Sequence, residues 1–280
     1  MFAAVPWKEH MFRRSPSSSA SSDAATANFN KLSEQLGEAA AAAARGDWDC
    51  ALAIWATFAH AGNARAQAQI GQCFVNGWGV GRDTDLALKW LTLSAKAGDA
   101  FGQSLLGDYY FNGEDGAPQR SIAEEWYSRA AGQGDAHAQD MFSWILTDGE
   151  HRKPDYKQAM HWSRKAAEQG IAASMTRIGL LYNNALGVER DVGAAARWWR
   201  KAALLGDADG QAMLGAAHHL GAGVRRDPVA ALVWLTRARL ARSKFADRFY
   251  HCVRETCTTE QRREAERRAG LPLGAEEVMQ

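Results

Sequence analysis

The fold of this chain is decided by the stretch from Ile178 to Ala203, which reads IGLLYNNALGVERDVGAAARWWRKAA. Its Trp198 belongs to a series of tryptophans that recur every 36 positions without an insertion. The series is Trp90, Trp126, Trp162, Trp198 and Trp234. Spacing this regular indicates that one structural unit is repeated five times, in an array in which each unit packs on its neighbours.

Each repeat contains two amphipathic segments, which we expect to form a pair of antiparallel helices. In the first segment a leucine or isoleucine precedes a glycine, and an aromatic residue follows three positions later, as in Ile178, Gly179 and Tyr182. We expect this glycine to let the partner helix approach closely, at a helix-propensity cost of about 1 kcal/mol relative to alanine. The five regular units are residues 64–99, 100–135, 136–171, 172–207 and 208–243.

The loop and the second segment supply the other repeated positions. A glycine after the first segment, such as Gly221 in the last unit, predicts that the first helix ends in a left-handed conformation. An aspartate before the second segment, such as Asp191 in the fourth unit, is expected to cap the second helix. An alanine stands three residues before each repeated tryptophan and leaves room for the indole. We therefore expect the five tryptophans to act as equivalent structural wedges, each costing about 3–5 kcal/mol when truncated.

Together these positions give A-x-x-x-x-L-G-x-x-Y-x-x-G-x-G-V-x-x-D-x-x-x-A-x-x-W-x-x-x-A-A-x-x-G-D, which resembles the Sel-one-like repeat, a relative of the tetratricopeptide repeat. The resemblance covers the five regular units and, in part, the flanking segments. It implies an all-α fold, a right-handed α-solenoid whose first helices line a concave surface. It also implies a non-enzymatic adaptor that binds a partner protein or peptide on that surface.

The segments outside the regular units lack the full pattern. Residues 1–28 are rich in Ser and Ala and predict a disordered tail. Residues 29–63 form a degenerate first helix pair, in which Trp55 takes the place of the repeated tryptophan. Residues 244–272 are expected to form capping helices, and residues 273–280 a loose tail.

The unit 136–171 departs most from the pattern. Ser143 and Leu146 replace the glycine and the aromatic residue, and the loop after Gly149 has a different sequence. We expect this loop to differ in shape. In the last unit Arg242 and Ser243 replace the closing Gly-Asp, which indicates that the regular array ends there.

Charge and hydropathy restrict the function. The net charge is +1, which argues against a general nucleic-acid or membrane-surface protein. No stretch approaches 18 consecutive apolar residues, and the apolar start of the chain is interrupted at Lys8 and Glu9. We expect a bacterial, cytoplasmic protein without membrane insertion. An exported or envelope-associated regulator is the alternative.

Four cysteines, Cys50, Cys73, Cys252 and Cys257, occupy no repeated position, and we expect them to be reduced. Cys50 and Cys73 would be the candidates for a bridge in an exported protein. The spacing of Cys252 and Cys257 does not fit a zinc site.

The sequence contains no motif for catalysis, nucleotide binding or a metal protease. His218 and His219 are adjacent, so on a helix they face different directions and would not share a metal. We expect no catalytic residue, cofactor or metal. The resemblance to the Sel-one-like repeat family, which has a cysteine-rich branch, suggests a hydrolase of cell-wall or β-lactam chemistry as a third alternative. This chain lacks the paired cysteines of that branch and an S-x-x-K nucleophile.

A partner surface is expected on the first helices, at positions that vary between units while the core positions repeat. Trp144 and Phe111 are the expected exposed anchors, although burial of Trp144 would replace the missing aromatic side chain at Leu146. Asn76, Asn112 and Asn184 can clamp a peptide backbone or cap their own helices. The candidate residues are Arg65, Gln72, Phe101, Asp108, Phe111, Asn112, His137, Asp140, Trp144, Arg177 and Asn183.

Overall fold

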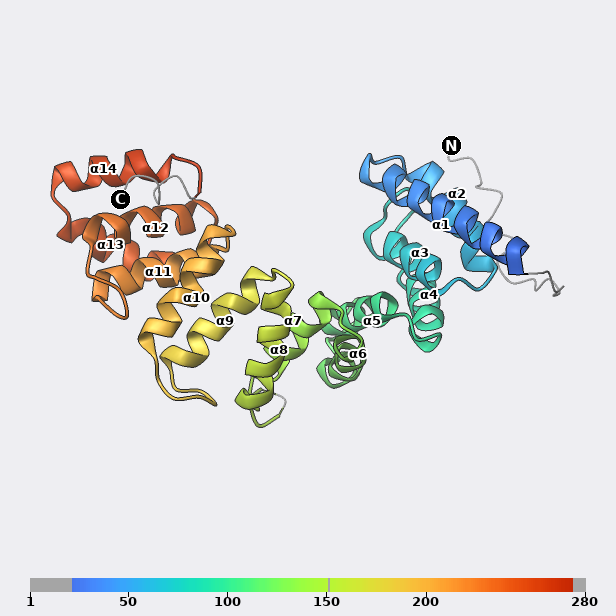
Figure 1. Cartoon of the computed structure of the whole chain (residues 1–280), viewed down its shortest axis with the longest axis horizontal. Coiled ribbons are helices and arrows are strands. Elements are labelled where there is room, and N and C mark those ends of the chain that lie inside the picture. The colour runs from blue at the N-terminus through green and yellow to red at the C-terminus, as the bar shows by residue number, and fades with distance from the viewer. Residues whose placement is uncertain (1–21, 151, 274–280) are drawn as a thin grey trace. The chain divides into compact units, whose positions relative to one another are not determined.

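The computed structural model describes residues 22–150 and 152–273, and all regular structure in these ranges is helical (Figure 1). The chain forms two compact units, an amino-terminal unit of residues 1–135 and a carboxy-terminal unit of residues 136–280. The boundary between them falls between the second and third regular repeats.

The amino-terminal unit is a stack of helix pairs. Each helix packs on the next along the chain, and α3 also packs on α5, so that the first helices of successive repeats lie side by side. Its helices are α1 (Ser22–Ala44), α2 (Trp48–His60), α3 (Ala64–Asn76), α4 (Thr84–Lys96), α5 (Ala100–Asn112) and α6 (Arg120–Gly132).

The carboxy-terminal unit is built in the same way, with α7 on α9 and α9 on α11. Two further helices pack on α12, where Val253, Cys257 and Ala265 cover Leu235. Its helices are α7 (Ala136–Ile145), α8 (Tyr156–Glu168), α9 (Ala172–Asn183), α10 (Val192–Leu204), α11 (Ala208–Leu220), α12 (Pro228–Leu240), α13 (Ala246–Thr256) and α14 (Thr259–Ala269).

In the four repeats that have it, the glycine of the first helix is a point of close approach, as expected. A Cβ atom added at Gly107 would lie 2.7 Å from the ring of Tyr127, and one added at Gly179 would lie 2.2 Å from Nε1 of Trp199. In the third repeat Ser143 stands at this position and the facing residue is the small Ser163, whose hydroxyl donates to Oγ of Ser143 at 3.1 Å. Ser143 is larger than the glycine of the other repeats, and Ser163 is smaller than the residues that face that glycine, so the two changes compensate each other in volume.

The expectation that the five repeated tryptophans are equivalent was wrong. Trp90 and Trp234 are 4% and 7% exposed, whereas the other three are half-buried. In all five repeats the position that faces the glycine of the first helix, or Ser143 in the third repeat, is the one after the tryptophan, because each helical residue is rotated by about 100° from the last. These next residues are all buried: Leu91, Tyr127, Ser163, Trp199 and Leu235.

The three half-buried tryptophans each carry a basic side chain on the open ring face. Arg129, Lys165 and Lys201 lie three residues after them, with the charged group 4.7, 4.8 and 4.4 Å from the ring centroid of Trp126, Trp162 and Trp198 respectively. Cation–π pairs at such exposed sites contribute about 0.5–1 kcal/mol. These tryptophans therefore stabilise the outer helices without forming the centre of the core.

Buried glutamines link successive repeats, a feature that the sequence interpretation missed. Nε2 of Gln67, Gln103 and Gln211 donates to a carbonyl in the last turn of the preceding helix at 3.1–3.2 Å. Burial makes these bonds costly to lose, because an unpaired buried amide is destabilising by about 1–3 kcal/mol. The 36-residue spacing of the glutamines was the available signal.

The amino-terminal boundary of the helical region differs from the expectation. Helix α1 begins at Ser22, so residues 22–28 are helical rather than part of a disordered tail. Three alanines in this segment favour the helix. The rest of the expected tail, residues 1–21, and residues 274–280 lie outside the described residues.

The loop of the third repeat has its own shape, as expected. Helix α7 ends at Ile145, earlier than its counterparts, and the chain then turns through hydrogen bonds such as Thr147 N to Trp144 O. His151 in this loop lies outside the described residues. Among the helices of residues 22–150 and 152–273, none has both the length and the apolar character needed to cross a membrane.

Candidate partner-binding surfaces

A pocket of about 220 Å³ lies between α3 and α5 in the amino-terminal unit. Its floor is apolar and includes the buried Leu91 and Tyr109. Its rim is polar. We call it the amide pocket and define it by the rim residues Gln72, Asn76, Trp78, Asp108, Asn112 and Glu114.

The repeat geometry brings this rim together. Gln72 and Asn76 lie one turn apart on α3, and Asp108 and Asn112 occupy the equivalent positions on α5. Because α3 and α5 pack side by side, the four side chains share one face. Nδ2 of Asn76 donates to the carbonyl oxygen of Gln72 at 2.9 Å, and Oδ1 of Asp108 accepts from the hydroxyl of Tyr127 at 2.6 Å.

Trp78 stands on the loop that follows α3 and supplies an aromatic wall. Gly77 ends the helix at a φ of 73°, and Gly79, at a φ of 67°, lies so close to Trp48 that an added Cβ would be 2.4 Å from it. The two indoles stack with centroids 5.0 Å apart, and Trp78 remains 38% exposed. The sequence interpretation missed Trp78, although no other repeat has an aromatic residue there.

Tyr109 in the pocket floor, and Tyr127 and Cys73 next to the rim residues Asp108 and Gln72, are held in their neutral forms. Burial, and then the nearby carboxylates of Asp115 and Asp85, raise the pKa of Tyr109 to about 12. Burial and the adjacent Asp108 raise the pKa of Tyr127, and burial raises the pKa of the Cys73 thiol to about 12. These groups are not activated nucleophiles at neutral pH. The arrangement can bind a ligand through hydrogen bonds and an aromatic face.

Three of the sequence-predicted partner residues, Gln72, Asp108 and Asn112, therefore meet in one pocket. Arg65 and Phe101 form a separate contact, in which the guanidinium lies 4.7 Å from the ring centroid and Nε lies 3.1 Å from Oδ1 of Asp99.

Phe111 is not the exposed anchor that the sequence suggested. Its ring is half-buried and contacts Tyr127 edge-on with centroids 6.3 Å apart. The guanidinium of Arg120 covers it at 4.6 Å. The ring packs in this cluster because Tyr127 and Arg120 of the paired helix α6 lie against it. Its removal would affect stability as well as any binding.

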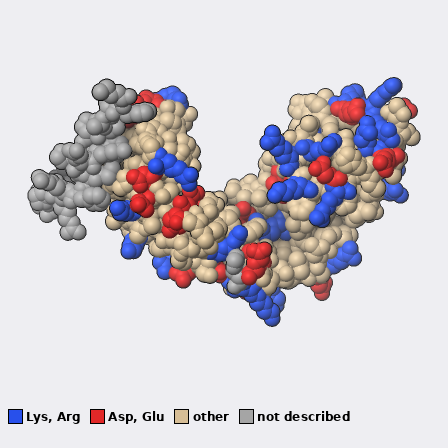
Figure 2. All heavy atoms as spheres, turned by 180° about the vertical axis from the view of Figure 1, so that it is seen from behind, with Lys and Arg blue, Asp and Glu red and all other residues tan. Residues whose placement is uncertain are grey.

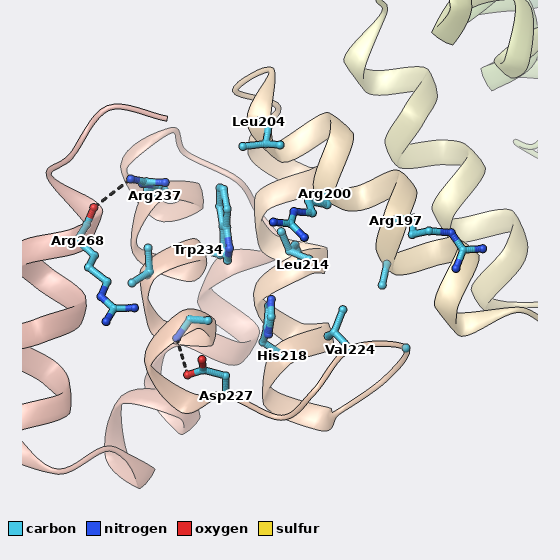
Figure 3. A pocket seen from close by; sticks show the side chains of 14 residues that line it. Arg197, Arg200, Leu204, Leu214, His218, Val224, Asp227, Trp234, Arg237 and Arg268 are labelled. Atoms are coloured by element: carbon cyan, nitrogen blue, oxygen red, sulfur yellow. Dashed lines mark hydrogen bonds between the residues drawn. The ribbon is translucent and has the colours of Figure 1, made fainter. Parts of the chain in front are cut away.

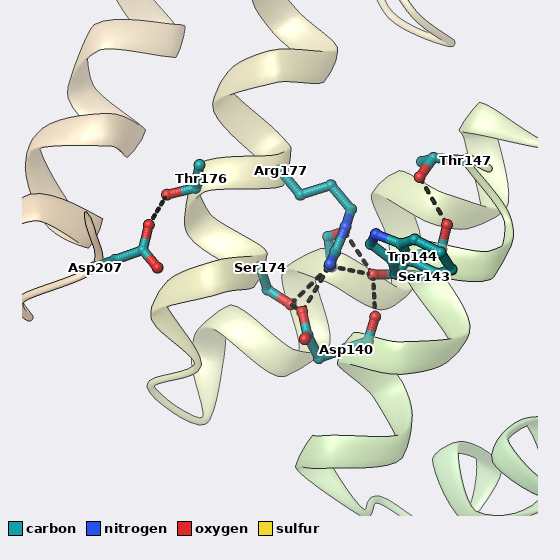
Figure 4. A network of polar contacts seen from close by, with 9 residues as sticks. Asp140, Ser143, Trp144, Thr147, Ser174, Thr176, Arg177 and Asp207 are labelled. Carbon is teal, nitrogen blue, oxygen red and sulfur yellow. Dashed lines mark hydrogen bonds and ion pairs between the residues drawn. The ribbon is translucent and has the colours of Figure 1, made fainter. Parts of the chain in front are cut away.

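Asp140 and Arg177 in the carboxy-terminal unit bind each other (Figure 4). Nη1 of Arg177 lies 2.6 Å from Oδ1 of Asp140 and donates to Oγ of Ser143 at 2.7 Å, and the hydroxyl of Ser174 donates to the same carboxylate. The two charged side chains are only 12% and 13% exposed. The pair therefore holds α7 to α9 rather than presenting two open charges to a partner.

The remaining predicted residues are spread over the first helices of the carboxy-terminal unit. His137 is exposed on α7, and Trp144 is half-buried on the same helix. Asn183 is half-buried at the end of α9 and donates to Oδ1 of Asn184 at 2.9 Å. None of these three residues lines the pocket between α3 and α5. All four cysteines are free thiols, and the described residues contain no cluster of three His, Cys, Asp or Glu suited to a metal ion.

The two units carry opposite net charge, which the whole-chain value conceals. The amino-terminal unit has 11 Lys and Arg against 15 Asp and Glu, a net charge of −4, and the carboxy-terminal unit has 22 against 17, a net charge of +5. In Figure 2, Lys and Arg side chains are spread over the visible face of the carboxy-terminal unit, at the right of the view. The two units are therefore suited to ligands of different charge.

Comparison with known proteins identifies the repeat. The Sel1 repeat family model matches residues 64–99, 100–135, 136–171, 172–207 and 208–241. The structure is similar to that of a protective antigen of uropathogenic Escherichia coli strains that displays an SLR fold, with 31% identity over 85% of this chain and a TM-score of 0.77. This chain spans 52% of that protein.

A second similar structure is that of a Sel1 repeat protein from Oxalobacter formigenes. It is 25% identical, has a TM-score of 0.73, and the similarity covers 85% of this chain and 97% of that protein. A search of the curated proteins gave no match.

Proposed function

The chain belongs to the Sel1 repeat family, and we propose that it is a non-enzymatic scaffold that binds an extended segment of a partner protein in the amide pocket. Sel1 repeat proteins generally mediate protein–protein interactions and are typically non-enzymatic scaffolds. The observation that carries the proposal is the convergence of Gln72, Asn76, Asp108 and Asn112 beside the exposed ring of Trp78.

The chemistry of the rim fits a peptide main chain. Asparagine and glutamine side chains each offer a donor and an acceptor, which is the complement of a peptide unit. Trp78 provides a large rigid surface of the kind that dominates interface energies. The carboxylates of Asp108 and Glu114, together with the net charge of −4, favour a neutral or basic segment over an acidic one.

The proposal is tested by selecting random 12-residue peptides on the full chain and measuring their affinity by calorimetry. We expect Asn112→Ala and Trp78→Ala each to weaken a selected peptide by about tenfold or more, because each removes a contact with the bound segment. Circular dichroism should show unchanged helix content, since Asn112 is exposed and Trp78 lies on a loop.

The matched control is Gln158→Ala, which removes an exposed amide from α8. This variant should change the affinity by less than about twofold. Equal binding by the wild type and by both pocket variants would show that the partner surface lies elsewhere, with Trp144 and His137 as the next positions to test.

The cytoplasm is the proposed location. The support for it is that Cys50 and Cys252 are free and exposed thiols, which are typical of a reducing compartment. Fusion of the first 30 residues to an export reporter tests this location. Secretion of the reporter would contradict it and favour an exported regulator.

A further inference from the structure

A second pocket, of about 180 Å³, lies in the carboxy-terminal unit and plays no part in the proposed function (Figure 3). It is bounded by α10, α11 and α12, with Arg268 contributed by α14. We call it the arginine pocket and define it by Arg200, His218, Trp234, Arg237 and Arg268.

Its polar wall is strongly cationic. In Figure 3 the side chains of Arg200, His218 and Trp234 point toward one another, and Arg237 and Arg268 lie on the opposite side of the indole. Asp227 is the one acidic lining residue, and its Oδ1 already accepts from the backbone N–H groups of Val229 and Ala230 at 2.9 and 3.0 Å. The charge of the wall is therefore positive.

Two of the arginines are held by contacts with α14 and the residues that follow it. Nη2 of Arg237 donates to the carbonyl oxygens of Arg268 and Leu271 at 3.0 and 2.8 Å, so this guanidinium is fixed in the wall. Nε of Arg268 lies 2.6 Å from Oε1 of Glu264. Arg200 is exposed on α10 and its side chain points to the pocket, so a ligand that enters from solvent can reach its guanidinium.

The pocket is small and part of its lining is apolar. Its apolar lining residues include Leu204, Leu214, Val224 and Val233. The volume is below the range of about 300–1,000 Å³ that holds whole cofactors or drug-sized ligands, so the occupant has the size of one amino-acid residue. It must combine an anionic group with an apolar group at short distance.

We propose that the arginine pocket binds the carboxy-terminal residue of a partner polypeptide, an apolar residue whose free carboxylate faces Arg200. A terminal leucine or a similar residue carries both required groups on one Cα atom. An internal acidic side chain has the carboxylate without the apolar part. Planar guanidinium groups bind carboxylates with well-defined geometry. This site does not rest on the amide pocket.

The test uses the full chain and N-acetyl-L-leucine, with the indole N–H resonance of Trp234 as reporter. We expect saturable binding with a Kd on the order of 1 mM, as suits so small a probe. N-acetyl-L-leucine amide, which lacks the charge, should bind about tenfold more weakly, and so should N-acetyl-glutamate amide, which lacks the apolar group.

Two variants of α10 locate the contact. Arg200→Gln should weaken the probe about fivefold or more, and Lys201→Gln, which removes the same charge from the neighbouring side chain over Trp198, should change it by less than about twofold. Equal loss in both variants, or equal binding of the acid and the amide, would overturn the proposal. Tighter binding of inorganic phosphate would overturn it in favour of a phosphate ligand.

Discussion

The amino-terminal and carboxy-terminal units are built from the same repeat but present different chemistry. The amide pocket lies between two first helices in a unit of net charge −4, and the arginine pocket lies beside α10 and α12 in a unit of net charge +5. The close contacts between the first and second helices of each repeat, such as that of Gly107 with Tyr127, form the packed interior. Positions that vary between repeats, such as those of Asp108 and Arg200, supply polar groups to both pockets, which shows how one scaffold can offer two distinct surfaces.

The largest expected effect is a loss of stability when a substitution disturbs the interior of the amino-terminal unit. Gly107→Ala places a Cβ atom 2.7 Å from the ring of Tyr127 and should lower the free energy of unfolding by about 3 kcal/mol. Thiol labelling in mild denaturant measures the effect, since Cys73 and Cys257 are buried in separate cores of the two units. Labelling of Cys73 should become about 100-fold faster while that of Cys257 stays nearly unchanged.

The control for this prediction is Gly37→Ala on α1, where an added Cβ meets nothing within 4 Å. This variant should stabilise the unit by up to about 1 kcal/mol, as alanine favours the helix over glycine. If Gly107→Ala were as stable as the wild type, the close approach of α5 and α6 would not be what determines how the two helices of the repeat pack.

A smaller expected effect is the difference in stabilising free energy between one ion pair of each unit. Arg177→Met leaves the carboxylate of Asp140 poorly exposed to solvent and without its cation, and should cost about 2 kcal/mol. Arg65→Met removes the partner of Asp99 in a pair whose arginine is 52% exposed, and should cost less than about 1 kcal/mol. Urea unfolding of both variants measures the difference. Similar losses would mean that burial does not distinguish the two pairs.

The smallest expected effect is a pH dependence specific to the carboxy-terminal unit. Burial, assisted by the charge of Arg200, lowers the pKa of His218 below 6.5, although the carbonyl of Arg225 and the carboxylate of Asp227 oppose the shift. Below about pH 6.5 the unfolded chain therefore binds a proton that the folded chain does not, and stability falls as the pH falls. Above that value the contribution of the neutral imidazole is fully present.

The comparison of wild type with His218→Gln isolates this contribution. The free energy of unfolding, measured in urea at pH 7.5 and pH 5.5, should fall less for the variant, because glutamine does not titrate. An equal fall in both proteins would assign the acid sensitivity to other groups and would contradict the burial of a neutral His218.

The repeat and its helices could be predicted from the sequence because they depend on positions that recur. The period of the tryptophans gave the units, and Asp83, Asp155, Asp191 and Asp227 cap the second helices as expected, each accepting backbone N–H bonds at 2.8–3.0 Å. Relative burial was harder to predict. Trp198 and Trp199 are adjacent, and a rotation of one helical position decides which of them faces the glycine of the first helix.

The candidate sites could be predicted only in part, because a pocket depends on which varied positions meet across helices. Gln72, Asp108 and Asn112 line one pocket, since equivalent positions of packed repeats align, but their role in binding stays a prediction. Trp78 was missed because its position depends on the backbone of a loop. The arginine pocket was missed because Arg200 and Arg268 are 68 positions apart and line the same pocket only through packing of α12 against α14.

The most direct test of two pockets with different chemistry is one tryptophan indole spectrum of the full chain, titrated in turn with N-acetyl-L-leucine and with a selected peptide that is amidated at its end. We predict that the first ligand shifts the resonance of Trp234 and leaves that of Trp78 in place, and that the second does the reverse. A ligand that shifted both resonances, or two ligands that shifted the same one, would contradict the assignment of separate binding chemistry to the two units.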